Sequence, residues 1–320
     1  MSSYDSASRQ LIAKKEATRG TYLAPTYASD FNVKCLEVGD PSFDFGHDGG
    51  VNVADGKFGL GKSYAGKKQA SISFQCDVNW SGTLATAPKW FKFMEGCGFL
   101  TDTSGLAAIS KWTGRPECVG MSFHLPIWSC GNTAPTAVSD IIAGACGSVS
   151  FGAEGVGMPI RMAFEFTGKS GGRIDETQAF TAPSGFDTAD CEVYLGSTVT
   201  VGATSYTAWS WNFAQGGEMQ SVDNPADVTN LIKTGIDYFK LGNVKPQLTM
   251  QKLRTTVAST NPVADVMNNT VFATIVIELT HFTLTYSGTQ PIEISAAVAN
   301  ESMVDELTFK IDTVEIKQKA

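Results

Sequence analysis

The sequence predicts a mainly β protein: an antiparallel β-sandwich or barrel with one or two short helices, a long protruding loop and an N-terminal arm. Several segments place apolar residues at every second position, which is the period of a half-buried strand. The 32 glycines, together with recurrent serine and threonine, suit many strands joined by tight turns. Apolar residues have helical spacing in only two short segments. A parallel sheet needs a helix between successive strands, so the pattern does not indicate one.

The clearest strand pattern begins at Ser71. Apolar residues alternate there with polar ones, and the apolar set is Ile72, Phe74, Cys76, Val78 and Trp80. One face of this strand is therefore expected to be buried while the other stays polar. Ser81-Gly82 then ends the strand.

A short helix is expected directly afterwards, over Pro88–Cys97. Proline is tolerated in a first helical turn, and Gly96 and Gly98 supply a stop. Trp90, Phe93, Met94 and Cys97 are spaced as one stripe of a helix. We expect Trp90, Phe93 and Met94, with Trp80 of the strand, to pack this helix on a sheet.

Further strand candidates follow along the chain, and a second helix is expected over Asn224–Thr234, between Pro225 and Gly235. Thr270–Leu279 is apolar on both faces and is predicted to be a central, fully covered strand. The strand candidates are Val119–Trp128, Ser148–Phe151, Pro159–Gly168, Cys191–Val201, Tyr206–Phe213, Pro246–Leu253, Thr270–Ser287, Pro291–Val298 and Leu307–Lys317.

These elements suggest a single domain over residues 1–320, composed of an N-terminal arm (1–34), a long loop (35–70) and a β core (71–320). The loop is rich in glycine and has little regular apolar period. Its aromatic residues Phe43, Phe45, Phe58 and Tyr64 argue against plain disorder, because disordered segments are poor in aromatics. We therefore expect a projecting arm or hairpin that becomes ordered against a neighbour.

One segment, Gly56–Ser63, formally matches the phosphate-binding pattern GxxxxGK[ST]. Such a loop needs a helix after it, because the N–H groups at the start of the helix hold the phosphates. Here Gly66 and a β-type pattern follow, so a flexible glycine-rich loop is the favoured interpretation. Nucleotide binding through Lys62 and Ser63 remains a distant alternative.

No catalytic, cofactor-binding or metal-binding residue is predicted, and the protein is not expected to be an enzyme. The three histidines are dispersed, and the seven cysteines contain no CxxC pair. Small buried thiols made in a reducing cytoplasm are the favoured interpretation of the cysteines, with a disulfide framework or zinc site as alternatives. No apolar run approaches the ~20 residues that a membrane span needs, and no apolar signal core begins the chain. The net charge of −8 argues against a protein that grips DNA phosphates.

Three blocks of sequence together resemble the tail tube proteins (major tail proteins) of long-tailed bacteriophages. They are RQLIAKKEATRGTYLAPTYASD (Arg9–Asp30), CDVNWSGTLATAPKWFKFMEGCGF (Cys76–Phe99) and GSVSFGAEGVGMPIRMAFEFTG (Gly147–Gly168). Their order and spacing agree with that family over roughly the first half of the chain. Beyond Gly168 the likeness is a general β pattern.

This resemblance implies a structural virion protein that assembles with itself into stacked, most often hexameric rings, forming a hollow conduit for DNA. Its partners would be further copies, other tail proteins at the tube ends, and viral DNA that passes without specific binding. It would be assembled in the host bacterial cytoplasm and reside in the virion tail. Tyr22 and Leu23 of the arm, with Phe43, Phe45, Phe58 and Tyr64 of the loop, are expected to contact neighbouring subunits or rings. Another ring- or tube-forming protein, such as a tail terminator or a secretion tube, is the alternative.

Overall fold

A computed structural model describes most of the chain. The described residues are 4–9, 11–24, 26, 30, 33, 35–44, 48–51, 60–64, 67–114, 118–129, 137–176, 187, 189–196, 198–223, 235–254, 261–299 and 302–319. The fold is mainly β, which confirms the predicted class. Its strands pair antiparallel throughout the described part of the chain.

The elements of the first half are β1 (Tyr4–Arg9), β2 (Ile12–Lys15), β3 (Cys35–Val38), β4 (Ser42–Asp44), β5 (Asp48–Val51), β6 (Leu60–Tyr64), β7 (Gln69–Asp77), α2 (Phe91–Gly96), β8 (Leu100–Asp102), β9 (Ile109–Trp112), β10 (Met121–Ser129) and β11 (Ala137–Ala153). Those of the second half are β12 (Arg161–Glu176), β13 (Thr198–Val201), β14 (Thr204–Ala214), β15 (Glu218–Asp223), β16 (Ile236–Gly242), β17 (Gln247–Leu253), α3 (Pro262–Met267), β18 (Phe272–Glu278), β19 (Phe282–Ala299), β20 (Ser302–Lys310) and β21 (Thr313–Gln318).

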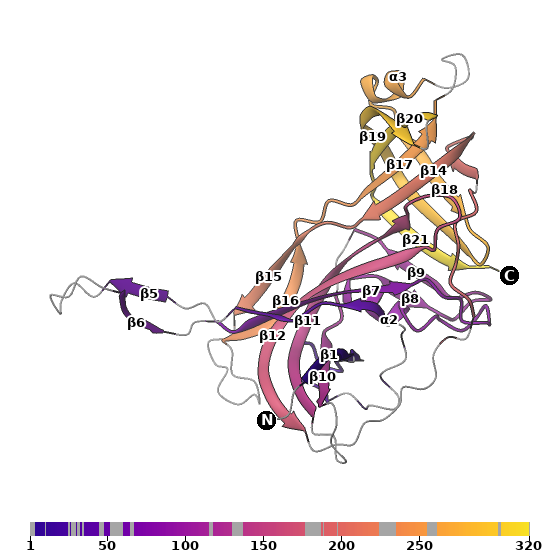
Figure 1. The fold of residues 1–320 in the computed structure, drawn as a ribbon. Helices are drawn as coiled ribbons and strands as arrows, with labels where there is room; N and C mark the ends of the chain where they lie inside the picture. The colour runs from indigo at the N-terminus through magenta and orange to yellow at the C-terminus, as the bar shows by residue number, and fades with distance from the viewer. Residues whose placement is uncertain are drawn as a thin grey trace.

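Six strands of the second half form a closed circuit of pairings. The circuit runs β13–β14–β17–β20–β19–β18 and returns to β13. This barrel occupies the upper part of Figure 1, with α3 at its tip. Alternate residues such as Met250, Leu307 and Ile275 are buried inside, as the period of a strand requires.

A large sheet extends from the barrel through the long hairpin of β11 and β12. β11 pairs with β14 of the barrel near its end and with β10 near its start, while β12 runs along its other side. β12 pairs in turn with β7. The register of β11 shifts around Gly144, which adopts a positive φ of 59°. The short strands β1 and β2 pair with β10 and so belong to this sheet.

The helix α2 covers the apolar face of this sheet. Phe93 lies with its ring centroid 4.8 Å from that of Phe74 on β7 and 5.5 Å from that of Phe164 on β12. Phe166 and Phe123 complete the aromatic cluster, at 6.3 Å and 6.4 Å from Phe93. The apolar stripe of the helix thus packs inside the main hydrophobic core.

The structure differs from the sequence expectations in the following segments. The expected arm (1–34) contributes β1 and β2 to the sheet, and the first part of the expected loop (35–70) contributes β3 and β4, which pair with β7. β18 lies between β13 and β19, as predicted for a central strand, but only the face with Ile275 and Ile277 is buried, so the strand is not fully covered. The expected helix over 224–234 lies outside the described residues, and α3 was not expected.

The cysteines also differ in part from the expectation. Cys118 and Cys146 form a disulfide, with their Cα atoms 5.8 Å apart, in a small apolar cluster with Ile236 and Phe239. No local sequence signal marks this pair, because 28 positions separate the two residues. Cys76 and Cys97 are free and fully buried, as expected for small apolar side chains.

Candidate assembly surfaces

The feature that stands furthest from the body is the two-stranded ribbon of β5 and β6. Asp48 pairs with Tyr64, Gly49 with Ser63, and Val51 with Leu60. The two strands form a separate sheet, and the ribbon projects sideways from the body in Figure 1. A lone two-stranded hairpin is marginally stable in water.

The predicted contact residues of the loop separate between the ribbon and its base. Tyr64 lies in β6 of the ribbon, whereas Phe45 and Phe58 lie outside the described residues. Phe43 lies in β4 opposite Ala70 of β7, and it is half-buried against the main core. Phe43 is therefore part of the base that supports the ribbon.

The phosphate-binding pattern also falls on the ribbon. Lys62 and Ser63 lie within β6, and Ser63 pairs with Gly49 of β5. A strand cannot present the row of free N–H groups that the first turn of a helix offers to phosphates. The second half of the pattern is thus a strand and not the expected flexible loop, and a strand does not supply the helix start that such a phosphate site requires.

The two predicted contact residues of the N-terminal arm have different surroundings. Tyr22 packs against Ile141 and Ala143 of β11, with its hydroxyl 3.4 Å from Nδ1 of His124. Leu23 is about one-third exposed, and its N–H donates to the hydroxyl of Ser122 at 3.1 Å. Leu23 therefore offers an apolar surface, while Tyr22 fixes the segment to the sheet.

A buried carboxylate anchors the arm just before these residues. Glu16 is 4% exposed and accepts hydrogen bonds from the N–H of Gly20 at 2.8 Å and of Gly144 at 2.7 Å. The hydroxyl of Ser122 donates to it at 2.7 Å. Burial raises the pKa of the Glu16 carboxyl, while these hydrogen bonds and nearby Lys169 oppose that shift.

A buried lysine and close backbone contacts complete the anchor. Lys169, 1% exposed, donates from Nζ to the carbonyl of Gly20 at 2.5 Å. A Cβ on Gly20 would lie 2.3 Å from the carbonyl oxygen of Asp237, and Gly20 has a φ of +83°. Only glycine fits this position without strain, which explains the glycine in the arm.

The predicted packing residues lie on α2 and in the segment between β7 and α2. Trp90, Phe93 and Met94 are buried, and Nε1 of Trp90 donates to the carbonyl of Asn79 at 3.0 Å. Trp80 is half-buried and stacks on the ring of His281, with centroids 4.8 Å apart. His281 in turn lies 2.9 Å from the buried carboxylate of Glu192.

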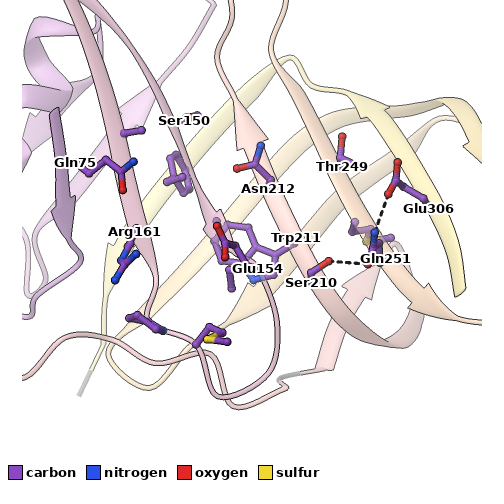
Figure 2. A pocket seen from close by; sticks show the side chains of 17 residues that line it. Gln75, Ser150, Glu154, Arg161, Ser210, Trp211, Asn212, Thr249, Gln251 and Glu306 are labelled. Atoms are coloured by element: carbon purple, nitrogen blue, oxygen red, sulfur yellow. Dashed lines mark hydrogen bonds between the residues drawn. The ribbon is translucent and has the colours of Figure 1, made fainter. Parts of the chain in front are cut away.

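A groove of about 460 Å³ with a mixed polar and apolar lining crosses the outer face of the large sheet. Figure 2 shows Gln75 and Arg161 on one side and Thr249, Gln251 and Glu306 on the other. Ser210 donates to Gln251 at 3.2 Å, and Gln251 donates to Glu306 at 2.8 Å. Within its lining, charge is limited to two glutamates and one arginine, with hydroxyl and amide groups between them.

The single arginine of the groove has an acidic neighbour. Arg161 lies 3.8 Å from Asp77, its register partner on β7. The two glutamates, Glu154 and Glu306, have no second cation in the lining. The groove is therefore slightly acidic, and its hydrogen-bonding groups are held by a rigid sheet.

Two further features concern metal binding and membrane spanning. No group of three or more potential metal ligands lies close enough together in the described part to hold an ion. Among the described helices, none has the length and apolar character to span a membrane.

The sequence was also compared with known proteins. No family model matches it, and no match was found among curated proteins.

Proposed function

We propose that this chain is a tail tube subunit of a long-tailed bacteriophage, a structural protein that assembles into stacked rings around a channel for DNA. The resemblance of the three sequence blocks motivates the proposal. The observation that carries it is the groove on the outer face of the large sheet, which crosses several strands and whose charged lining residues are two glutamates and one arginine. No catalytic step and no cofactor is part of this function.

Such a face suits the wall of a DNA channel for an electrostatic reason. Proteins that hold DNA neutralise its phosphates with lysine and arginine. The lining of the groove has one arginine beside Asp77, and its serine, threonine and amide side chains carry no positive charge. DNA would pass such a wall without being retained.

The ribbon supports the self-assembly part of the proposal. It is an isolated pair of strands that gains stability by packing on another surface. In the proposed tube that surface belongs to a neighbouring copy. Other tail proteins would complete the ends of the tube, and the assembled protein would reside in the virion.

Electron microscopy of the purified protein tests the proposal directly. Negatively stained samples are expected to contain rings and hollow tubes. Closed rings that never stack would instead favour a tail terminator or another ring-forming protein, and monomers at all concentrations would contradict self-assembly. Calorimetry with ATP and Mg²⁺ is expected to be flat, and binding that Lys62→Ala abolishes would favour the nucleotide alternative.

The character of the channel wall has its own test. We expect the double substitution Gln75→Lys and Asn212→Lys to make assembled tubes bind DNA at low salt, with binding lost as salt rises. Leu106→Lys, at a residue that is 93% exposed outside the groove, is the matched control. Equal DNA binding by both variants would argue against the groove as the channel wall.

A further inference from the structure

Three of the free cysteines lie close to one another where the large sheet begins. Cys35 lies in β3 and Cys76 in β7, and these two residues are register partners. Cys191 is near enough to act electrostatically on Cys76, but it pairs with Asn79, beyond the end of β7. The Sγ of Cys191 points to backbone, 3.4 Å from the carbonyl oxygen of Glu192. The fold therefore places one pair of thiols directly opposite each other, with a third thiol further along the strand.

The placement of Cys35 and Cys76 meets the geometric requirement of a disulfide. Opposite residues of an antiparallel pair have Cα atoms about 4.5–5.5 Å apart, and disulfides span Cα separations of about 4.4–6.8 Å. Both side chains lie on the same side of the strands, because Cys76 belongs to the main hydrophobic core and Cys35 packs against that core. The register of β3 shifts only after this pair, between Cys35 and Glu37. A bond between the two sulfurs therefore needs no change in the register of the pair.

The two thiols differ in their exposure to solvent. Cys35 is partly exposed, whereas Cys76 is fully buried. Burial raises the pKa of the Cys35 thiol to about 12, against an opposing effect of the Lys92 charge. A thiol must lose its proton before it attacks a disulfide. Cys35 is therefore the thiol that an oxidant from solution reaches first, and its reaction is slow at neutral pH.

We propose that Cys35 and Cys76 form an oxidation site that reacts with a small-molecule disulfide, such as glutathione disulfide, to give a second disulfide in this chain. The thiolate of Cys35 attacks one sulfur of glutathione disulfide, and one glutathione leaves from the mixed disulfide that forms. The thiolate of Cys76 then attacks the Cys35 sulfur of the mixed disulfide and releases the second glutathione. Two protein thiols are oxidised, the disulfide of the oxidant is reduced to two thiols, and the two protons pass to the released glutathione molecules.

The new bond closes the segment of the chain that carries the ribbon. The strands β4, β5 and β6 all lie between Cys35 and Cys76, so the bond joins the two ends of the projecting segment at its base. Closing a long loop restricts the unfolded chain more than the folded one, which stabilises the fold. A reducing cytoplasm keeps the pair as two thiols, and oxidising surroundings favour the bond. This inference does not depend on the tube proposal.

Peptide mapping of the full-length protein tests the pairing. The protein is incubated with glutathione disulfide under nitrogen, the remaining thiols are alkylated, and the digest is analysed by mass spectrometry without reduction. We expect one peptide pair joined through Cys35 and Cys76, a protein mass lower by two hydrogen atoms, and an unchanged link between Cys118 and Cys146. Alkylation of both Cys35 and Cys76, a glutathione that remains on Cys35, or a link from Cys76 to Cys191 would overturn the inference.

Three variants assign the role of each thiol. Cys35→Ser should abolish both the mixed disulfide and the link, because the thiol that attacks the oxidant is missing. Cys76→Ala should stop the reaction at the mixed disulfide, so that one glutathione stays on Cys35. Cys191→Ser is the matched control and should form the link as fast as the wild type. A Cys76 link that persists in Cys35→Ser, or a loss of the link in folded Cys191→Ser, would contradict the assignment.

Thermal unfolding measures the effect of the bond on the fold. The midpoint of the wild type should exceed that of Cys35→Ser by more after oxidation than after reduction with dithiothreitol, because the wild type alone can close the loop. Reduction opens the link between Cys118 and Cys146 in both proteins, so this second disulfide cancels in the comparison. The same gap under both conditions would show that no stabilising bond forms at this site.

Discussion

The N-terminal arm and the β5–β6 ribbon both look like extensions in the sequence, but only the arm packs on the body of the protein. The arm lies on the large sheet through β2 and a buried carboxylate, whereas the ribbon stands away from the body as a separate sheet. Leu11, Ile12 and Ala13 are buried in the arm, and no comparable apolar run occurs at the start of the ribbon. A short apolar run with one well-placed charge is thus enough to fix a segment to a sheet.

The largest effect that would test this comparison is expected from Glu16→Ala. It leaves the N–H groups of Gly20 and Gly144 and the hydroxyl of Ser122 buried without their acceptor, beside the charge of Lys169. Removing one member of such a buried group costs about 3–5 kcal/mol of unfolding free energy. Chemical denaturation measures the loss.

Glu37→Ala is the matched control for this substitution. Glu37 is an exposed glutamate on β3, and its removal is expected to change the unfolding free energy by less than about 0.5 kcal/mol. If the two variants unfold at the same denaturant concentration, Glu16 does not anchor the arm.

A second and smaller effect concerns Lys92, whose Nζ donates to the carbonyls of Asp30 at 2.8 Å and Ala13 at 3.3 Å. Burial lowers the pKa of Lys92 to about 8 from 10.5, against opposing effects of Asp30 and Cys35. Between these values the unfolded chain binds the proton and the folded chain does not, so stability rises as pH rises from 8 to 10.5. Below pH 8 Lys92 is protonated in both the folded and the unfolded chain, so the desolvation of its charge lowers the unfolding free energy in full.

Comparison with Lys92→Met isolates this contribution from other titrating groups. Wild type should gain about 2–3 kcal/mol of unfolding free energy relative to the variant across this pH window. Denaturation at pH 8 and at pH 10.5 measures the difference. Parallel pH profiles for the two proteins would show that the ammonium group is not desolvated beneath the arm.

The sequence predicted those elements whose apolar pattern lies within a short run of consecutive residues. The alternation from Ile72 to Val78 and the helical stripe around Phe93 are each contained within about ten residues, and both elements appear close to the expected positions. The hairpin of β11 and β12 was predicted only in part. Its strands continue through polar and glycine positions, such as Ser139 and Gly172, that interrupt the apolar alternation.

The anchor of the arm could not be predicted, because its partners are far apart in the chain. Lys169 and Gly20 are separated by 149 positions, and Glu16 and Gly144 by 128. A lysine and a glutamate in isolation are typical of a solvated surface, and only the fold reveals that these two are buried. For the candidate surfaces, the sequence gave no signal for the groove, because its lining joins residues from β7, β11, β12, β14, β17 and β20.

The smallest effect on stability is expected from the ribbon, and this expectation completes the comparison with the arm. Replacing residues 48–64 by a short glycine-serine linker leaves β4, β7 and Phe43 in place. Since the ribbon belongs to no larger sheet, its loss should change the unfolding free energy of the monomer by less than about 1 kcal/mol. Assembly should nevertheless be lost, because the ribbon would no longer reach a second copy. Thermal unfolding measures the stability of the variant, and sedimentation velocity measures its assembly. A folded variant that still assembles would contradict the role given to the ribbon. A variant that unfolds would show that the ribbon, like the arm, belongs to the body.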